Sequence, residues 1–583
     1  MEQQLEHKRH TLAHILAQAV TSMYPHAKLT LGPAIDNGFY YDIDFGDGES
    51  PGEEDLKKIQ KTMRKSINKW TEWEAEVVTP DKAREVFADN KYKLELIDEI
   101  EEKGETITLY TCGGFTDLCR GGHCENPKEE IATDAFKLDK IAGAYWRGDE
   151  KNPMLTRIYG VAFDEKEELV AWEKQQAEAK ARDHRKLGKE LDLFTFSDIV
   201  GPGLPLFTPR GTIMRDLIVD KIMSIQKKYG YQKVAIPHIT KSDLYKTSGH
   251  WEKYGDDLFK VTGRGDTEFV IKPMNCPHHT QIYASQPRSY KDLPIRYTET
   301  TMVYRDEQAG ELIGLGRVRS ISQDDGHSFC TVDQIEQEVE AIVEVIKAFY
   351  SSLGMYEEGN FWVSLSVRDP QEPDKYLGDP ANWDKAEEML TSVADRMKLP
   401  YKRIEGEAAF YGPKLDFMFY DAIGRERQLA TAQVDFSQPE RFGLEYTDEN
   451  GEKQTPVMIH RAIAGSLERF MAIMIEHFAG RFPLWLAPEQ VRILPVAQVH
   501  DEYAQSVLDE LREAGFRVEL DDPTETLGKR IRNAKKAKLP YIIVIGDQEA
   551  EAKTVTLESR DTEESTTHSM SELLTKLTDE VNV

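Results

Sequence analysis

The sequence has few cysteines and no long hydrophobic run. Five cysteines in 583 residues are a small and odd number, which argues against a disulfide framework and favours a reducing compartment. The longest apolar pieces are short, such as YIIVIG at 541–546, whereas a membrane-spanning helix needs roughly 20 apolar residues. The N-terminal MEQQLEHKRH has no apolar signal-peptide region. We therefore expect a cytoplasmic protein with no membrane partner.

Net positive charge is also lacking, because 103 Asp and Glu residues outnumber 74 Lys and Arg residues. The formal net charge is -29 at pH 7, so general affinity for nucleic acid is not expected, because phosphate contacts need Lys and Arg. Two local basic runs, KARDHRKLGK at 180–189 and KRIRNAKKAK at 529–538, are the candidates for contact with RNA. Each could equally be a solvated helix face.

A phosphate-binding P-loop of the form GxxxxGK[ST] is missing from the sequence, so kinase-like or ATPase-like chemistry is not indicated. The length predicts several domains rather than one. Residues 1–172 mix predicted helices and strands, 173–190 form a charged linker helix, and 191–486 form a central body. Residues 487–583 alternate strands and helices, which predicts an α/β layered domain.

The central body is expected to begin with a helix over residues 212–230. Its apolar residues recur at helical spacing and predict one buried face. They are Met214, Leu217, Ile218, Ile222 and Ile225.

Three residues set far apart carry the strongest chemical signal: Cys276, His327 and His460. A thiolate and two imidazoles make a three-ligand zinc set that leaves one coordination position open for substrate. Structural zinc usually draws its ligands from one or two short hairpins, so this wide spacing suggests a metal built into a large sheet. Taken singly, a cysteine or histidine is more often a buried structural residue, and the surrounding arginines change that balance.

The segments around these residues resemble the signature motifs of class II aminoacyl-tRNA synthetases, and the match is closest to threonyl-tRNA synthetases. Residues 230–239, GYQKVAIPHI, resemble motif 1 with its Pro237. Residues 304–329 resemble motif 2, an arginine-led strand, a loop and a returning strand. Residues 462–470, AIAGSLERF, resemble the motif 3 helix. The resemblance covers nearly the whole chain.

This resemblance implies an α+β multidomain fold. An N-terminal α+β editing domain and a linker helix would precede a catalytic core built on the antiparallel sheet of class II synthetases. A C-terminal α/β anticodon-binding domain would follow. The implied reaction joins L-threonine to tRNA(Thr) with ATP, in a homodimer whose contact is made by the 212–230 helix and the motif 1 strand. Family members often begin with a ubiquitin-like (TGS) domain, which we expect this chain to lack because HTLAH occurs almost at its start.

Adenylation brings a carboxylate to the α-phosphate of ATP, and both are anionic, so the site needs fixed positive charge. The resemblance implies that Arg305 holds the α-phosphate and the carboxylate, Arg317 supports the phosphates of a bent ATP, and Arg469 holds the γ-phosphate end. Mg²⁺ would accompany ATP.

One zinc per subunit, held by the triad, would explain the choice of amino acid. Threonine can present its amino group and hydroxyl to one metal, whereas valine lacks the hydroxyl and leaves a polar site unsatisfied. Asp325, two residues before His327 on the same side of an extended strand, matches the family's acceptor for that hydroxyl. Other matched positions line the substrate pocket: Gln323, Tyr411, Lys414 and Gln433.

Serine keeps both chelating groups, and its missing methyl is worth only roughly 1–3 kcal/mol, so a second, hydrolytic site is expected. His10 and His14 lie four apart on one predicted helix face, and Cys119 and His123 have the same spacing. HxxxH with CxxxH resembles the editing domain shared by threonyl- and alanyl-tRNA synthetases. The donor set has metal-ligand character, although the resemblance implies hydrolysis of Ser-tRNA by water without an obligatory zinc. Lys93 and Asp117 match family positions in this pocket.

Some positions depart from the family pattern or match it only loosely. Gly122 stands where proline is expected, and Ser320 where motif 2 often has glycine. The acidic stretch TVTLESRDTEESTT at 554–567 is unusual near RNA, and Glu549 and Arg560 are the carried-over anticodon positions.

Two alternative functions stay open at this point. A prolyl-type class II synthetase would share the anticodon domain, but the metal triad and the N-terminal HxxxH argue against it. A synthetase-like RNA-binding regulator without catalysis would be favoured by loss of the motif 2 or motif 3 arginines, and both are present. A second role in mRNA autoregulation stays open beside the synthetase function.

Overall fold

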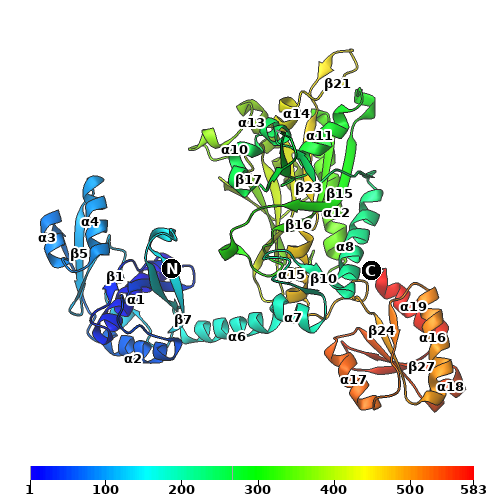
Figure 1. The fold of residues 1–583 in the computed structure, drawn as a ribbon, viewed down its shortest axis with the longest axis horizontal. Coiled ribbons are helices and arrows are strands. Elements are labelled where there is room, and N and C mark those ends of the chain that lie inside the picture. Colours follow the sequence, from blue (N-terminus) through cyan, green and yellow to red (C-terminus); the bar gives the residue numbers. More distant parts are fainter. Residues whose placement is uncertain (1, 266, 583) are drawn as a thin grey trace. The chain divides into compact units, whose positions relative to one another are not determined.

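The computed structural model describes residues 2–265 and 267–582 and divides into two compact units, Met1–Ala177 and Glu178–Val583. Figure 1 shows the chain with its elements labelled. The division falls inside helix α6 (Lys166–Arg182). No helix in the described ranges is long and apolar enough to cross a membrane.

The N-terminal unit is a mixture of helices and antiparallel sheets, as expected. Helix α1 (Glu2–Met23) buries Leu12, Ile15, Leu16 and Val20 against the main sheet. That sheet has the order β1-β3-β8-β7, with β2 paired to β3, and a second sheet has the order β4-β5-β6. The strands are β1 (Lys28–Leu29), β2 (Ala34–Ile35), β3 (Gly38–Asp44), β4 (Glu74–Val78), β5 (Ile107–Cys112), β6 (Phe115–Leu118), β7 (Phe136–Tyr145) and β8 (Met154–Ala162), and the main helices besides α1 are α2 (Leu56–Ile67), α3 (Pro80–Val86) and α4 (Lys91–Glu102).

The body of the second unit is built on an eight-stranded sheet of order β11-β15-β16-β23-β20-β19-β17-β18. The central pairs are antiparallel, as predicted, and the pairs at the two edges, β11 with β15 and β17 with β18, are parallel. The strands are β11 (Gln232–Lys233), β15 (Ile295–Tyr304), β16 (Ser320–Cys330), β17 (Phe361–Val367), β18 (Tyr401–Glu405), β19 (Lys414–Tyr420), β20 (Glu426–Asp435) and β23 (Val457–Ala462).

Helices cover one large apolar core beside this sheet. It includes buried residues of α12 (Ile335–Ser351), α13 (Pro380–Arg396) and α15 (Leu467–His477). The helix predicted over 212–230 is α8 (Pro209–Lys227). Thr208 caps it by accepting from the Gly211 N–H, and a proline occupies its first turn, both typical of helix N-termini. Met214, Ile218, Ile222 and Ile225 are buried and Leu217 is partly buried, so the predicted periodicity is confirmed.

The predicted linker helix is two helices. After α6 the chain breaks at Asp183, and α7 (His184–Glu190) follows. Asp183 has non-helical φ and ψ of -47° and 121°, and its side chain accepts from the Arg185 N–H. An aspartate that caps the next helix competes with continuing the previous one, which explains the break.

The C-terminal part of the second unit has a five-stranded sheet of order β25-β24-β26-β27-β28. Its first three strands are parallel and alternate with helices, as expected, and the last two are antiparallel. The acidic stretch at 554–567 forms most of this final pair. The elements are β24 (Val491–Pro495), α16 (Asp501–Glu513), β25 (Val518–Leu520), α17 (Leu527–Lys536), β26 (Tyr541–Ile545), α18 (Asp547–Ala552), β27 (Thr554–Ser559), β28 (Ser565–Ser569) and α19 (Met570–Val581).

Candidate active sites

The sheet brings the three candidate metal ligands together. His327 on β16 and His460 on β23 are direct cross-strand partners, and Cys276 begins α11 (Cys276–Ala284). All three are buried, and their donor atoms lie within 4.8 Å of one another. His327 Nε2 and His460 Nδ1 are 3.2 Å apart. Two nitrogens bound to one tetrahedral zinc would be separated by about 3.3 Å, so these donors fit zinc.

Each imidazole of the triad is held through its other nitrogen. His460 Nε2 lies 2.8 Å from Asp435 Oδ2, and His327 Nδ1 lies 2.7 Å from His279 Nδ1. Asp435 is fully buried, and its Oδ1 accepts from the N–H groups of Ser437 and Gln438. Such contacts orient metal-binding imidazoles and fix their tautomers. Neither Asp435 nor His279 was predicted from the sequence. The only available signal was their position close to the predicted site residues Gln433 and Cys276.

Burial governs the protonation of Cys276 and His327. It raises the pKa of the Cys276 thiol well above its usual range and lowers that of His327 well below. The imidazole is therefore in the neutral form that binds metals, whereas the thiol would need a bound cation to ionise. This donor chemistry fits a site made for a metal ion.

A cavity of about 190 Å³ opens beside the triad. Asp325 lies in its wall, 3.1 Å from the amide nitrogen of Asn275, and burial raises the pKa of this carboxyl. Tyr411 stacks on His460 with ring centroids 4.8 Å apart and donates a 2.6 Å hydrogen bond to Gln433. Further lining residues are Cys276, Arg305, Gln323, His327, Gln433 and His460. Lys414 instead pairs with Asp416 at 2.5 Å. It is not among the described residues that line this cavity.

A larger cavity of about 570 Å³ contains all three candidate phosphate-binding arginines, Arg305, Arg317 and Arg469. Motif 2 was expected to begin with a strand led by an arginine. In the structure, β15 ends at Tyr304 and Arg305 is the residue that follows it. Arg317 is paired with Glu307 at 2.7 Å and Glu311 at 2.8 Å. Burial lowers the pKa of Arg469. The two cavities share four lining residues: Arg305, Gln323, Thr431 and Ala462.

The N-terminal unit gathers its predicted cluster equally closely. The donor atoms of His10, His14, Cys119 and His123 lie within 4.8 Å of one another. Cys119 Sγ is 3.5 Å from His10 Nε2 and 3.4 Å from His123 Nε2. Although burial opposes ionisation, these hydrogen bonds lower the pKa of Cys119 to about 3. Likewise, burial disfavours charge on His14, but its contacts with Asp117 and Cys119 raise its pKa to about 9.

Asp117 links the cluster to a buried lysine. Its carboxylate lies 3.2 Å from His14 Nδ1 and 2.6 Å from Lys93 Nζ, and Tyr41 donates to it at 2.6 Å. The charges of Lys93 and His14 outweigh burial and lower the pKa of Asp117. Tyr41 was missed in the sequence, as was Trp73, which stacks on His123 at 3.8 Å. An aromatic residue far along the chain gives no local signal of either contact.

The two anticodon candidates have structural contacts of their own. Glu549 accepts from the Gly546 N–H at the start of α18 and from Thr556 at 2.6 Å. Arg560 is bidentate to Asp561 and also donates to the carbonyls of Phe482 and Lys538. Their role toward RNA stays a prediction.

The antiparallel sheet, the arginine-lined cavity and the motif order define a class II aminoacyl-tRNA synthetase. Family models match three parts of the chain: the tRNA synthetase class II core domain (G, H, P, S and T) at 259–478, an anticodon binding domain at 490–580, and the threonyl and alanyl tRNA synthetase second additional domain at 107–159.

Relatives that align with nearly the whole chain identify the family within this class. The chain is 50% identical to a threonine–tRNA ligase of Gloeobacter violaceus over 96% of this chain and 89% of the relative. It is 48% identical to that of Rubrobacter xylanophilus, with 95% and 85% covered. The chain belongs to the threonine–tRNA ligase family.

Solved structures agree with this assignment. The RNA binding domain of threonyl-tRNA synthetase from Cryptosporidium parvum is 38% identical, with a TM-score of 0.64, 68% of this chain covered and 98% of that chain. A prolyl-tRNA synthetase from the same organism is 18% identical with a TM-score of 0.54, over 68% of this chain and 76% of that chain, and shares the fold alone. The prolyl alternative is therefore not supported.

Proposed function

We propose that this chain activates L-threonine with ATP, transfers it to tRNA(Thr) and hydrolyses mischarged Ser-tRNA(Thr). One observation carries the first step: the small cavity beside the triad and the larger arginine-lined cavity meet at Arg305 and Gln323. A threonine carboxylate and the α-phosphate of ATP, one in each cavity, would meet at Arg305.

Three arginines would stabilise the adenylation transition state. Arg305 would contact the attacking carboxylate and the α-phosphate, Arg469 the γ-phosphate end, and Arg317 the phosphates between them. Arg317 would exchange Glu307 and Glu311 for phosphate. Mg²⁺ would enter with ATP as part of that substrate. Positive charge placed where anionic charge develops lowers the barrier most effectively in a site shielded from water.

Selection of threonine would take place beside the triad. Zinc held by Cys276, His327 and His460 would supply a Lewis-acidic position for the amino group and hydroxyl of threonine. Asp325 would accept a hydrogen bond from the threonine hydroxyl, since Asp325 lines this cavity. Valine would leave these polar groups unpaired, which sites of this kind reject strongly.

Hydrolysis of Ser-tRNA would use the N-terminal cluster of His10, His14, Cys119 and His123. Lys93 lies beside Asp117 in a buried pair and could stabilise a developing oxyanion. Water positioned by the imidazoles would be the nucleophile. Residues 1–172 would form this editing domain, 173–190 the linker, 191–486 the catalytic domain and 487–583 the anticodon-binding domain, acting in the cytoplasm.

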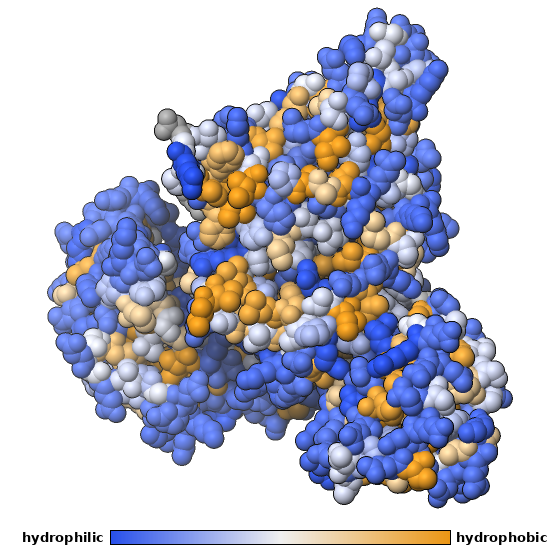
Figure 2. All heavy atoms as spheres, turned by 45° about the vertical axis from the view of Figure 1, so that its right-hand side comes forward, coloured by the Kyte–Doolittle hydropathy of each residue, from blue (hydrophilic) through white to orange (hydrophobic). Residues whose placement is uncertain are grey.

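A homodimer is part of this proposal. The resemblance places the contact at α8, and exposed apolar side chains on this helix and shortly before it support the proposal, because exposed apolar surface can mark an interface. Ile199 is 98% exposed, and Leu206 and the α8 residue Ile213 are also exposed. Figure 2 shows hydrophobic side chains gathered on the body of the second unit. Light scattering should give twice the 66.6 kDa chain mass, and Ile199→Asp with Ile213→Asp should lower it.

The proposed reaction is tested by ATP–pyrophosphate exchange with threonine, serine and valine. We expect exchange with threonine, weaker exchange with serine and little with valine. Exchange that prefers valine to serine would contradict the proposed use of the triad, and no exchange with any of the three would contradict the proposed function.

A further inference from the structure

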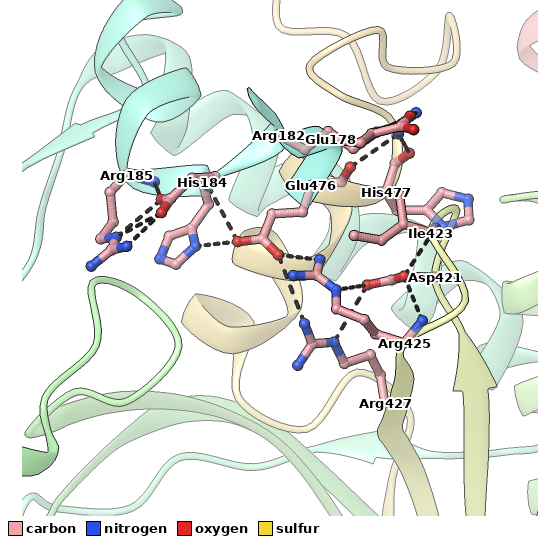
Figure 3. Close-up of polar contacts among 11 residues, drawn as sticks. Glu178, Arg182, His184, Arg185, Asp421, Ile423, Arg425, Arg427, Glu476 and His477 are labelled. Carbon is pink, nitrogen blue, oxygen red and sulfur yellow. Dashed lines mark hydrogen bonds and ion pairs between the residues drawn. The ribbon is translucent and has the colours of Figure 1, made fainter. Parts of the chain in front are cut away.

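A buried histidine outside both cavities contacts two separate segments of the second unit, helix α15 and the turn that contains Leu315. His184 begins α7 and is only 5% exposed. Its Nδ1 lies 2.7 Å from Oε1 of Glu476, near the C-terminal end of α15. On its other side, the backbone N–H of Leu315 donates to its Nε2 at 3.1 Å. Figure 3 shows the ring beside Glu476 and its arginine partners.

These contacts fix the tautomer of His184. Because Nε2 accepts the Leu315 N–H, the ring proton is on Nδ1 and is donated to Glu476. Leu315 is fully buried, and His184 provides the acceptor for its N–H. A buried N–H without an acceptor is costly, so the turn around Leu315 depends on this ring.

The carboxylate of Glu476 is itself held in place. Arg425 lies 2.5 Å from its Oε2 and 2.7 Å from Asp421, and Arg427 lies 3.8 Å from Glu476. Burial alone would raise the pKa of Glu476, but the His184 hydrogen bond and the Arg425 charge lower it. Arg182 also donates to the last carbonyls of α15, at Glu476 and His477. Figure 3 shows His184, Arg425 and Arg427 directed at the Glu476 carboxylate, with Asp421 beside Arg425.

The turn that rests on His184 leads directly into the phosphate cavity. The Ile313 N–H donates to the Arg317 carbonyl at 3.2 Å, and the Gly316 N–H to the Ile313 carbonyl at 2.7 Å. Gly314 has φ +49°, and a Cβ there would lie 2.4 Å from His184 Nε2, so the turn packs directly on the ring. Gly316 and Arg317 line the cavity.

A bound metal is the competing explanation, since donor atoms of Asp183, His184 and Glu476 lie within 4.8 Å of one another. Asp183 already accepts from the backbone and side chain of Arg185, and both ring nitrogens of His184 are in use. The arginines around Glu476 also disfavour a further cation.

We propose that His184 is a positioning residue for ATP: it transmits the fixed position of Glu476 on α15 to the Ile313–Arg317 turn, and so sets where Arg317 meets the phosphates. The proposal rests on the proposed function, in which ATP phosphates lie at Arg317. It makes the start of α7, which lies inside the basic run at 180–189, part of the ATP site's support.

Three substitutions separate the two hydrogen bonds. His184→Ala loses both, His184→Gln can still reach the Leu315 N–H with a side-chain oxygen, and His184→Asn keeps only a donor toward Glu476. Glu190→Ala, on an exposed residue of the same helix outside the basic run, is the matched control. Pyrophosphate exchange is measured with ATP varied at saturating threonine, then with threonine varied at saturating ATP. Hydrogen exchange is followed in the peptide that contains Leu315.

His184→Ala should raise KM for ATP roughly tenfold, which corresponds to the loss of one buried hydrogen bond, and leave KM for threonine within twofold. His184→Asn should resemble it, His184→Gln should be nearer to wild type, and Glu190→Ala should equal wild type. The Leu315 amide should exchange faster in the Ala and Asn variants. If the Ala variant does not fold, the comparison of Gln with Asn carries the test.

Equal increases in both KM values, or unchanged exchange at Leu315, would overturn the proposal. So would a second metal ion per chain that is lost on His184→Ala. Wild-type protein without threonine-dependent exchange would refute the proposed function instead, and the amide exchange at Leu315 would still test the role of His184.

Discussion

Replacing Asp435 by asparagine should weaken zinc binding although Asp435 touches no metal. Its Oδ1 accepts two backbone N–H groups, from Ser437 and Gln438, at 2.8 and 2.9 Å, and its Oδ2 faces His460 Nε2 at 2.8 Å. In Asp435→Asn the oxygen must stay with the two N–H groups. The new NH₂ then meets His460 Nε2, which carries the ring proton when Nδ1 binds a metal. Two donors would face each other.

The magnitude follows from this conflict. His460 must either give up the hydrogen bond or move its proton to Nδ1, which removes the lone pair that faces His327. Loss of such an outer contact typically costs 10–100-fold in metal affinity, or about 1.4–2.8 kcal/mol. We expect Asp435→Asn to fall in that range and to lose threonine activation in step with its zinc.

Zinc affinity is measured by competition with a chromophoric chelator, and activation by pyrophosphate exchange in the same samples. Asp42→Asn is the matched control, because Asp42 is a buried carboxylate paired with Arg157 in the other unit. An Asp435→Asn protein that holds zinc as tightly as wild type would refute the tautomer argument. A protein that loses activation but keeps its zinc would refute the link between metal and substrate.

Three further predictions concern the arginines and the N-terminal cluster. Arg469→Ala should lower pyrophosphate exchange by roughly 10²–10³-fold with zinc content unchanged, and near-normal exchange would contradict its phosphate role. His10→Ala with His14→Ala should leave threonine activation intact but accumulate Ser-tRNA, so clearance at the wild-type rate would make the cluster structural. Cys119, with its pKa lowered to about 3, should react with iodoacetamide at nearly the same rate from pH 5 to 8, because the thiolate is the nucleophile. Buried Cys124, with its pKa raised to about 11, is the control, and a Cys119 rate that climbs with pH would contradict the thiolate.

The candidate ligands could be predicted because their motifs place rare reactive residues in a recognisable order. That His327 and His460 are direct cross-strand partners could not, since strand register is fixed by the packing of the whole sheet. The α8 helix could be predicted from its apolar spacing alone. The break at Asp183 had a local signal, an aspartate before a helical run, but the charged periodicity on both sides hid it.

The residues that orient the sites were out of reach for a different reason. Asp435, Glu476 and Tyr41 act on side chains that are 25, 292 and 76 residues away. A buried carboxylate or hydroxyl carries no local pattern that names its distant partner. Only the folded sheet and helices bring such pairs within hydrogen-bond distance. The residues that orient the site side chains could therefore be identified only from the structure.

Two histidines of the second unit, His460 and His184, share one arrangement of contacts but have different roles. His460 and His184 each have one ring nitrogen 2.7–2.8 Å from a buried or nearly buried carboxylate. In both cases the ring N–H donates to the carboxylate, and the opposite nitrogen is left with a lone pair of fixed direction. What faces that lone pair decides the outcome. At His460 it is His327 Nε2, in a site that also holds Cys276, where the fitting partner is a cation. At His184 it is the Leu315 N–H, so the same device orders a turn of the backbone.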